Sequence, residues 1–342
     1  MTSTVRFVGQ PLLWLYNLLL LGWWLLHLVV GDSWWWMGLL NSFVPLFFAP
    51  LLLLIPLALV IRRPLYLCGL LLPLTFLLAN YGFYWLPKPQ PPHAPVPPPL
   101  TIMTFNMWSG SRLPETVQVI HDNGLPDIVA LQETDYLLRR LVQREIGDLY
   151  PYQLYEQTPI GRGISILSRF PLTPLRPEAM IVDLNCRLYR VTVDATHPVL
   201  LYNCHPQSSN LLAFFGDGRP MADQIGETFF LRQQLSLALA AEIRTASEPV
   251  IVVGDFNMTD QSDAYSNLAR VLHDAHRNAG WGFGHTFPAY GGSFRNIPIL
   301  PRLVRIDMIF YSDAFVALES HVSDSHGESD HLPVLAALAW RE

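Results

Sequence analysis

Three long apolar runs near the N-terminus set the strongest limit on how this chain can fold. They cover residues 11–31, 36–61 and 65–86. A helix that spans a bilayer needs about 20 apolar residues, and hardly any charge interrupts these runs. A cleaved signal peptide has a single short apolar core, so the pattern predicts three transmembrane helices and makes residues 1–86 a membrane anchor. A buried helical hairpin in a soluble protein is the alternative.

The few charges around these runs indicate an orientation. Arg6 precedes the first run, Arg62 and Arg63 separate the second from the third, and Asp32 lies in the first connection. Positively charged loops tend to stay in the cytoplasm, so three spans would place the following domain on the extracytoplasmic side. If the second and third runs formed one re-entrant element, that domain would lie inside instead. We therefore expect a multi-pass protein of the cell (inner or plasma) membrane, with the lipid bilayer as its partner.

A change of composition separates the apolar runs from the rest of the chain. Residues 87–99 are rich in proline, which predicts an extended and semi-rigid linker. Residues 100–342 carry 18 arginines and 27 acidic residues, a net charge of −9 with histidine neutral. Such a domain lacks the broad cationic surface that binds nucleic acid by neutralising phosphates. Individual arginines could still bind one phosphate group.

The three cysteines, Cys68, Cys186 and Cys204, form no metal-binding pattern. Cys186 and Cys204 fall in two different strand-like segments and could pair if their geometry allowed it. Free buried thiols are favoured over that pairing.

From Leu100 onward the sequence consists of short, strand-like apolar runs that end at or begin with polar residues. These runs cover residues 100–110, 126–134, 163–169, 187–195, 199–205, 249–257, 305–312 and 329–338. Helical stretches lie between them, at 115–123, 136–146 and 227–246. This order predicts an α/β (α+β) domain in which helices cover a core of sheets.

Carboxylate, amide and imidazole side chains stand in or beside these runs. They are Glu133, Asp255, Asn257, Asp307, Asp330 and His331. Each one alone is typical of a turn or a helix cap. Their conjunction in one domain indicates a site, because turns alone do not require so many of them at the ends of strands.

The sequence resembles the endonuclease/exonuclease/phosphatase superfamily, the deoxyribonuclease-I-like proteins. The matching stretches, in family order, are TFNMW, LQET, GISILSR, NCHP, GDFN, RIDMIF and SDHLPV, and they extend over residues 100–340. The resemblance implies a four-layer α/β sandwich for residues 100–342. It also implies hydrolysis of a phosphoester by water.

The resemblance further implies a metal centre. Glu133 would be the main ligand, with Asn106 beside it and Asp330 as a second metal-site carboxylate. Oxygen ligands suit Mg²⁺, with Mn²⁺ as a possible substitute, and no cysteine–histidine cluster indicates zinc.

The catalytic roles are also implied by the resemblance. His331 would contact the scissile phosphate or assist the attacking water, and Asp307 would orient its imidazole. Asp255 would orient or deprotonate the water, and Asn257 would bind a phosphate oxygen. His205 would assist the leaving group, or alternatively pack under a loop at the end of a strand.

The substrate is less constrained than the chemistry, since one fold can support many functions. Met308 follows Asp307 where bacterial members often have histidine, which weakens any transfer of substrate preference. Residues 206–230 mix apolar side chains with glycine and could either enter a lipid interface or pack on the domain. Arg302 and Arg305 are candidate phosphate ligands, with structural ion pairs as the alternative.

Three functions therefore remain open. A phosphodiesterase or phosphatase acting on a lipid headgroup or another phosphoester at the outer membrane face is favoured. A membrane-tethered nuclease that acts on extracytoplasmic nucleic acid is the close alternative, and a catalytically inactive binding module is the third.

Overall fold

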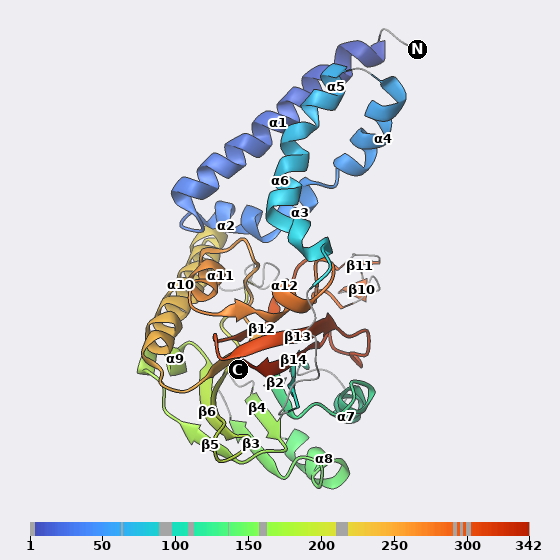
Figure 1. Ribbon diagram of the computed structural model, residues 1–342. Coiled ribbons are helices and arrows are strands. Elements are labelled where there is room, and N and C mark those ends of the chain that lie inside the picture. Colours follow the sequence, from blue (N-terminus) through green and yellow to red (C-terminus); the bar gives the residue numbers. More distant parts are fainter. Residues whose placement is uncertain are drawn as a thin grey trace.

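The computed structural model describes residues 4–62, 64–88, 98–108, 113–135, 137–156, 163–209, 218–289, 293–294, 297–298 and 302–341. A set of helices stands on one end of a domain built from two sheets (Figure 1). We call residues 4–85 the N-terminal helices. They are α1 (Thr4–Val30), α2 (Trp35–Ser42), α3 (Val44–Phe47), α4 (Leu51–Ile61), α5 (Pro64–Gly69), α6 (Leu71–Tyr81) and the 3₁₀ helix η1 (Gly82–Trp85).

Two helical segments, Gln10–Val30 and Pro64–Trp85, are long and apolar enough to cross a membrane. The second apolar run differs from the single helix expected at 36–61. Its two parts, Trp35–Ser42 and Val44–Val60, are bent by 72° relative to each other, and they make a third candidate only if the pair forms one span. Prolines at residues 45 and 50 favour helix starts, which explains the breaks before α3 and α4.

Two six-stranded sheets form the rest of the protein. The first has the order β13-β14-β1-β2-β4-β3 and the second β5-β6-β7-β8-β12-β9. The first contains β1 (Leu100–Asn106), β2 (Ile128–Thr134), β3 (Tyr152–Glu156), β4 (Gly163–Ser168), β13 (Phe315–Val322) and β14 (Val334–Trp340). The second contains β5 (Leu172–Leu175), β6 (Cys186–Thr192), β7 (Pro198–Cys204), β8 (Val250–Asp255), β9 (His273–Asp274) and β12 (Asp307–Tyr311). A small hairpin joins β10 (Ser293–Phe294) to β11 (Ile297–Pro298).

Apolar side chains from both sheets, such as Ile102 and Ile251, form a shared core. The outer face of the first sheet packs on α7 (Leu113–Asp122) and α8 (Leu138–Glu145). The outer face of the second packs on α9 (Ala179–Asp183), α10 (Met221–Thr245) and α11 (Asp263–Ala269), while α12 (Ala275–Ala279) lies against β12 and β13. The α/β prediction is confirmed, and this two-sheet fold is consistent with a deoxyribonuclease-I-like domain.

The carboxyl ends of four central strands and the start of a fifth meet at one edge of the sandwich. Strands β1 and β2 are parallel and end together, with Asn106 opposite Gln132. Strands β7 and β8 are also parallel, and β12 runs antiparallel to β8 so that Asp307 lies opposite Asp255. Polar residues that are far apart in the sequence therefore gather at this edge.

Cys186 and Cys204 are register partners on β6 and β7, and they form a disulfide. The preference for free thiols at these positions is therefore wrong. The pairing depends on strand register, which the spacing of two cysteines does not reveal.

The N-terminal helices also contact the sheet domain directly. The amide of Asp32 donates to Asp263 Oδ2 and the amide of Asp263 donates to Asp32 Oδ2, both at 2.8 Å. The hydroxyl of Tyr84 donates to Asp260 Oδ2 at 2.9 Å. Residues 89–97 of the expected linker lie outside the described residues, but these contacts give the two parts a second connection.

Candidate active site

Glu133 reaches the site through an irregularity in its strand. The pairing of β2 with β4 shifts register between Gln132 and Thr134, and Glu133 has a φ of 55°. A bulge re-aims a side chain, and a left-handed backbone at a residue other than glycine is a strain that often accompanies functional sites. Asn257 has a similar φ of 51°.

Asp255 is positioned by the glycine that precedes it. Gly254 has a φ of 147°, and a Cβ there would overlap the carbonyl oxygen of Cys204 on β7. Glycine is therefore required for the close approach of β8 to β7. Asp255 is the last residue of β8 and is buried.

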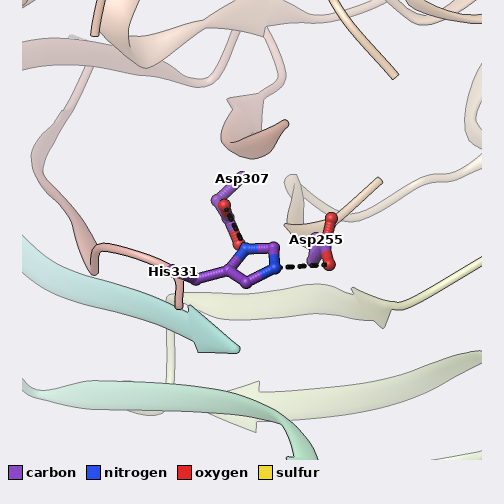
Figure 2. Close-up of side chains that lie close together, drawn as sticks. All are labelled: Asp255, Asp307 and His331. Atoms are coloured by element: carbon purple, nitrogen blue, oxygen red, sulfur yellow. Dashed lines mark hydrogen bonds and ion pairs between the residues drawn. The ribbon is translucent and has the colours of Figure 1, made fainter. Parts of the chain in front are cut away.

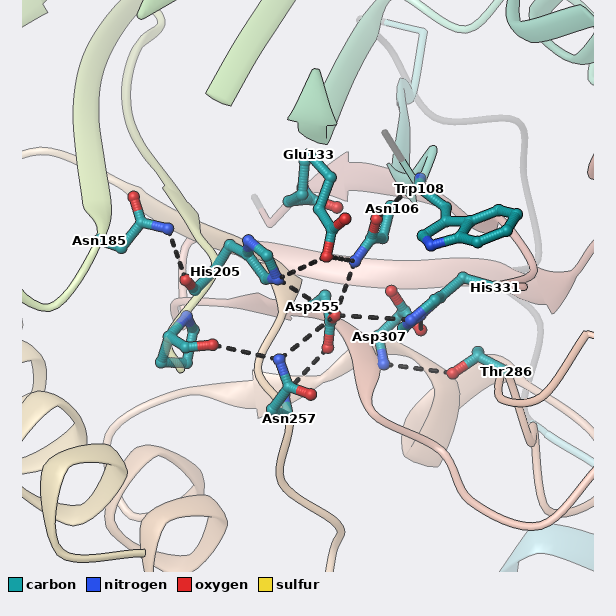
Figure 3. Close-up of polar contacts among 12 residues, drawn as sticks. Asn106, Trp108, Glu133, Asn185, His205, Asp255, Asn257, Thr286, Asp307 and His331 are labelled. Carbon is teal, nitrogen blue, oxygen red and sulfur yellow. Dashed lines mark hydrogen bonds and ion pairs between the residues drawn. The ribbon is translucent and has the colours of Figure 1, made fainter. Parts of the chain in front are cut away.

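Asp255 lies at the centre of the cluster, as Figure 3 shows. Its Oδ2 accepts a hydrogen bond from Asn106 Nδ2 at 2.9 Å and lies 3.6 Å from His205 Nε2 and 3.7 Å from His331 Nε2. Its Oδ1 accepts the backbone N–H of Asn257 at 3.0 Å. Glu133 Oε1 joins the group at 3.5 Å from Asn106 Nδ2 and 3.6 Å from His205 Nε2.

His331 lies between two carboxylates (Figure 2). Its Nδ1 is 2.9 Å from Asp307 Oδ2, and its Nε2 faces Asp255. Burial alone would lower the pKa of His331, but the carboxylates of Asp307 and Asp255 raise it to about 10. Burial raises the pKa of Asp307 against the opposing charge of His331. We therefore expect an imidazolium at neutral pH, with Nε2–H directed to the centre of the cluster.

Asp330 lies beside this cluster and is partly buried. Burial raises its pKa, His331 opposes that rise, and the charges of Glu133 and Asp255 add to it. Its Oδ1 is buried and has no hydrogen-bond partner among the described residues. An acceptor oxygen in these surroundings would be stabilised by a cation.

The residues present fit a divalent metal ion. Glu133, Asp255 and Asp330 supply hard oxygen atoms, and the buried acceptor oxygen of Asp330 offers a ligand position. Asn106 presents its nitrogen to Glu133 and uses its oxygen to accept the N–H of Trp108, so it would have to rotate its amide to act as a ligand. Asp255, Asp307 and His331 also offer ligand atoms within 4.8 Å of one another.

The structure brings together Asn106, Glu133, His205, Asp255, Asn257, Asp307 and His331, all expected from the sequence. His205 does not merely pack under a loop, because its Nε2 faces both Glu133 and Asp255. Asn185 holds its backbone by donating to the His205 carbonyl at 2.7 Å. Asn257 Nδ2 also donates to the carbonyl of Pro206, on the same segment, at 3.1 Å.

Arg305 is the clearest departure from the expected site. Its guanidinium is buried, lies 2.7 Å from Asp274 Oδ2, and donates to the hydroxyl of Tyr84 at 2.8 Å. It is a structural ion pair, so its interpretation as a phosphate ligand is wrong. Arg302 is partly exposed and pairs with Asp324 at 2.6 Å, which also matches the structural alternative.

Several supporting residues were not predicted. The hydroxyl of Ser329 donates to the carbonyl of Asn106 at 2.6 Å and accepts the N–H of His331 at 3.0 Å. Its place in the SDH motif could have indicated this role. The hydroxyl of Thr286 accepts the N–H of Asp307 at 3.3 Å, and the Phe287 ring lies 4.9 Å from that of His331.

Arg232 is a further residue that no motif could have indicated. It is buried on α10 and donates to the carbonyl of Asn257 and, at 2.7 Å, to the hydroxyl of Ser209. Burial lowers its pKa to about 10, partly opposed by the charges of Asp32 and Asp255. It remains a cation near neutral pH and braces the backbone that follows Asp255.

Chemically, this arrangement can bind a hard cation through its carboxylates. The imidazolium of His331 can donate a proton or stabilise an anionic oxygen. Asp255 can accept a hydrogen bond from a water molecule, since its Oδ2 faces the centre of the cluster.

The chain is similar to known proteins in sequence and in fold. The model of the Endonuclease/Exonuclease/phosphatase family matches residues 103–331. No curated protein matches the sequence. Among solved structures, an endonuclease/exonuclease/phosphatase family protein from Bacteroides thetaiotaomicron has a TM-score of 0.51 at 17% identity, covering 71% of this chain and 98% of its own.

Two similar structures are TDP2 proteins. Truncated TDP2 from Caenorhabditis elegans has a TM-score of 0.53 at 18% identity, covering 70% of this chain and 97% of its own. TDP2 from D. rerio, complexed with a single-strand DNA product, has a TM-score of 0.53 at 17% identity, covering 70% and 98%. At these identities the likeness shows a shared fold.

Proposed function

The chain belongs to the endonuclease/exonuclease/phosphatase family, whose members are hydrolases acting on phosphoester bonds, and we propose that it is a membrane-anchored, divalent-metal-dependent phosphoesterase. The observation that carries this proposal is a chain of contacts of 3.6–3.7 Å at one sheet edge, from Glu133 to His205, from His205 to Asp255 and from Asp255 to His331. These residues come from separate strands and loops, and a purely structural role would not require four ionisable groups there.

Each residue has a role in hydrolysis by water. Asp255 orients the attacking water and accepts its proton. The imidazolium of His331, held by Asp307, stabilises the charge that develops on a phosphate oxygen. His205 assists the leaving group, and the side chain of Asn257 binds a phosphate oxygen.

Glu133 and Asp330, with Asn106 after rotation of its amide, would hold Mg²⁺ or Mn²⁺. When bound, the ion supplies Lewis acidity that neutralises phosphate charge.

The favoured substrate is a lipid headgroup or another phosphoester at the membrane surface. The net charge of −9 for residues 100–342 opposes non-specific binding of nucleic acid, and two apolar helices are long enough to hold the domain at a bilayer. In the segment 206–230, residues 210–217 lie outside the described residues, but Phe230 is 57% exposed and available to an apolar partner. The observation on the side of the alternative function, a nuclease, is the likeness in fold to TDP2 complexed with a single-strand DNA product.

We also propose that the sheet domain is extracytoplasmic. Arg62 ends α4 at the tip of the N-terminal helices away from the sheet domain, and α1 begins at that same tip with Arg6 in its first turns (Figure 1). Positive charge at this tip favours a cytoplasmic location for it. A disulfide between Cys186 and Cys204 would persist in an oxidising compartment.

The test uses the full-length protein in detergent with Mg²⁺ and bis-p-nitrophenyl phosphate. Glu133→Ala and His331→Ala should each reduce kcat by about 10²-fold or more, while His197→Ala, at a histidine outside the cluster, should not. Chelation should abolish activity, and returning Mg²⁺ should restore it and raise the Tm. Two further assays distinguish a lipid substrate from nucleic acid: release of headgroups from lipid vesicles, and nicking of a plasmid. A folded wild type that cleaves no phosphoester would refute the proposal.

A further inference from the structure

An exposed aromatic and cationic patch joins the sheet domain to the end of the last N-terminal helix. We call Trp85, Lys88, Arg277 and Trp281 the interface patch. The rings of Trp85 and Trp281 meet edge to face with centroids 5.8 Å apart, although they are 47% and 62% exposed. Two large aromatic side chains that are exposed side by side indicate a surface for an apolar partner.

The two cations of the patch are fixed beside these rings. Lys88 Nζ donates to the carbonyl of Phe83 at 2.7 Å and to that of Arg277 at 2.8 Å. The guanidinium of Arg277 lies 3.9 Å from the centroid of the Phe83 ring, and its side chain is exposed. Positive charge therefore lies next to exposed tryptophan, at the end of a helical segment that could cross a membrane.

This combination matches the chemistry of a membrane surface. Tryptophan favours the level of the lipid headgroups, and lysine and arginine next to a span attract anionic lipids. Trp85 is the last residue of the candidate span Pro64–Trp85, so the patch lies where that span would leave the hydrocarbon.

The patch is continuous with the active site through one loop. Gly282 N donates to the carbonyl of Tyr84 at 3.0 Å, which holds Trp281 on η1. A few residues later the same loop carries Thr286, whose hydroxyl accepts the N–H of Asp307, and Phe287, whose ring lies by His331. A surface that holds Trp281 in place thus also holds the loop that supports Asp307 and His331.

We propose that the interface patch lies in the headgroup region of the bilayer, with Trp85 and Trp281 in the interface and Lys88 and Arg277 against the phosphates of anionic phospholipids. The proposal rests on membrane insertion of the N-terminal helices, as part of the proposed function. It places the loop Trp281–Phe287 on the leaflet and gives the active site access to lipid headgroups.

The test attaches an environment-sensitive fluorophore to full-length protein in nanodiscs. Trp281→Cys is labelled in a Cys68→Ala background, and Tyr152→Cys is the matched control, because Tyr152 is also exposed but lies on β3 at the far end of the domain (Figure 1). We expect a blue shift at position 281 and quenching by lipids that carry a headgroup-region spin label, with neither effect at position 152. Adding phosphatidylglycerol to phosphatidylcholine discs should increase the shift, and Lys88→Gln with Arg277→Gln should remove that increase.

Equal quenching at positions 281 and 152 would overturn the patch, as would a blue shift at position 281 without quenching by the spin-labelled lipids, which would indicate a protein partner or a second copy. Failure to enter nanodiscs would overturn both the anchor and the patch. Hydrolysis of bis-p-nitrophenyl phosphate is measured separately on the same samples. Its loss would count against the enzyme proposal and leave the patch standing.

Discussion

At the scale of single residues, the site depends on how charge is placed around His331. Its ring is buried between Asp307 and Asp255, and these carboxylates raise its pKa although burial opposes the rise. Asp307 is fully buried, so its charge is poorly screened by water. The pair therefore keeps a proton on the imidazole over the physiological pH range.

Replacing Asp307 by asparagine should release that proton. Asp307→Asn preserves the shape but removes the charge, so the pKa of His331, about 10 in the wild type, should fall. Since the proposed mechanism uses the protonated form, kcat/KM should decline at lower pH than in the wild type and fall at neutral pH by about 10²-fold. The pH profile of kcat/KM measures this, with the Tm as a control for folding. An unchanged alkaline limb would mean that Asp307 does not set the proton on His331.

His276 gives a pH effect on stability rather than on activity. Burial and the charge of Arg305 lower its pKa to about 4, so it is neutral in the folded protein. The stabilising effect is present above its unfolded pKa of about 6.5 and is lost as pH falls toward 4, up to about 3 kcal/mol. In His276→Gln the amide could still donate to Gly282, but this pH-dependent loss should disappear. Thermal unfolding of the wild type and of His276→Gln at several pH values in this range tests the prediction. If the Tm of both proteins fell equally with pH, the prediction would be contradicted.

At the scale of elements, the central strands were predictable from the sequence and the edge strands were not. The eight runs expected as strands correspond to β1, β2, β4, β6, β7, β8, β12 and β14, which are the inner strands of the two large sheets. The four strands of these two sheets that were missed, β3, β5, β9 and β13, are their edges. An inner strand is covered on both faces and reads as a continuous apolar run, whereas β13 alternates between buried and exposed residues.

The same reasoning explains which site residues were predictable. Glu133, Asp255 and Asp307 stand on inner strands, so an apolar run marks each of them. Arg305 also stands next to such a run, but its partner Asp274 lies on the edge strand β9, which no pattern indicated. Pairing across a sheet is a tertiary property, so the sequence could not separate a structural arginine from a phosphate ligand.

A side chain at Gly254 should prevent the close packing of β8 against β7. Gly254→Ala creates both backbone strain and an overlap with the Cys204 carbonyl, and we expect a loss of roughly 3 kcal/mol or more, or failure to fold. Gly124→Ala is the matched control, because Gly124 also has a positive φ, of 76°, but nothing lies within 4 Å of its Cβ position. Its cost should be about 1 kcal/mol. Equal Tm values for the two variants would show that the close packing of β8 against β7 does not contribute to stability.

At the scale of the whole molecule, one loop connects the N-terminal helices to the candidate active site. Asp255 ends β8, and the segment that follows carries Asn257 into the cluster. A few residues later Asp260 accepts a hydrogen bond from Tyr84, and Asp263 exchanges hydrogen bonds with Asp32. The N-terminal helices therefore help to support residues 256–263, the segment after β8, which we call the catalytic loop. An isolated sheet domain would lose this support.

Removing the hydroxyl of Tyr84 tests that coupling. It donates to Asp260 and accepts from Arg305, so Tyr84→Phe leaves a half-buried carboxylate and a buried guanidinium with one partner fewer each, and should cost about 1–3 kcal/mol. Because Asp260 lies on the loop that directly follows Asp255, kcat for a soluble phosphodiester should fall several-fold while the protein remains folded.

Tyr16→Phe is the matched control, since its hydroxyl donates to the carbonyl of Phe47 inside the N-terminal helices, at 2.8 Å. It should lower the Tm without changing kcat, because no described bond joins Tyr16 to the catalytic loop. If both variants lose stability and neither loses activity, the catalytic loop holds its shape without the N-terminal helices. If Tyr84→Phe alone loses activity, docking of the N-terminal helices helps to set the position of Asp255.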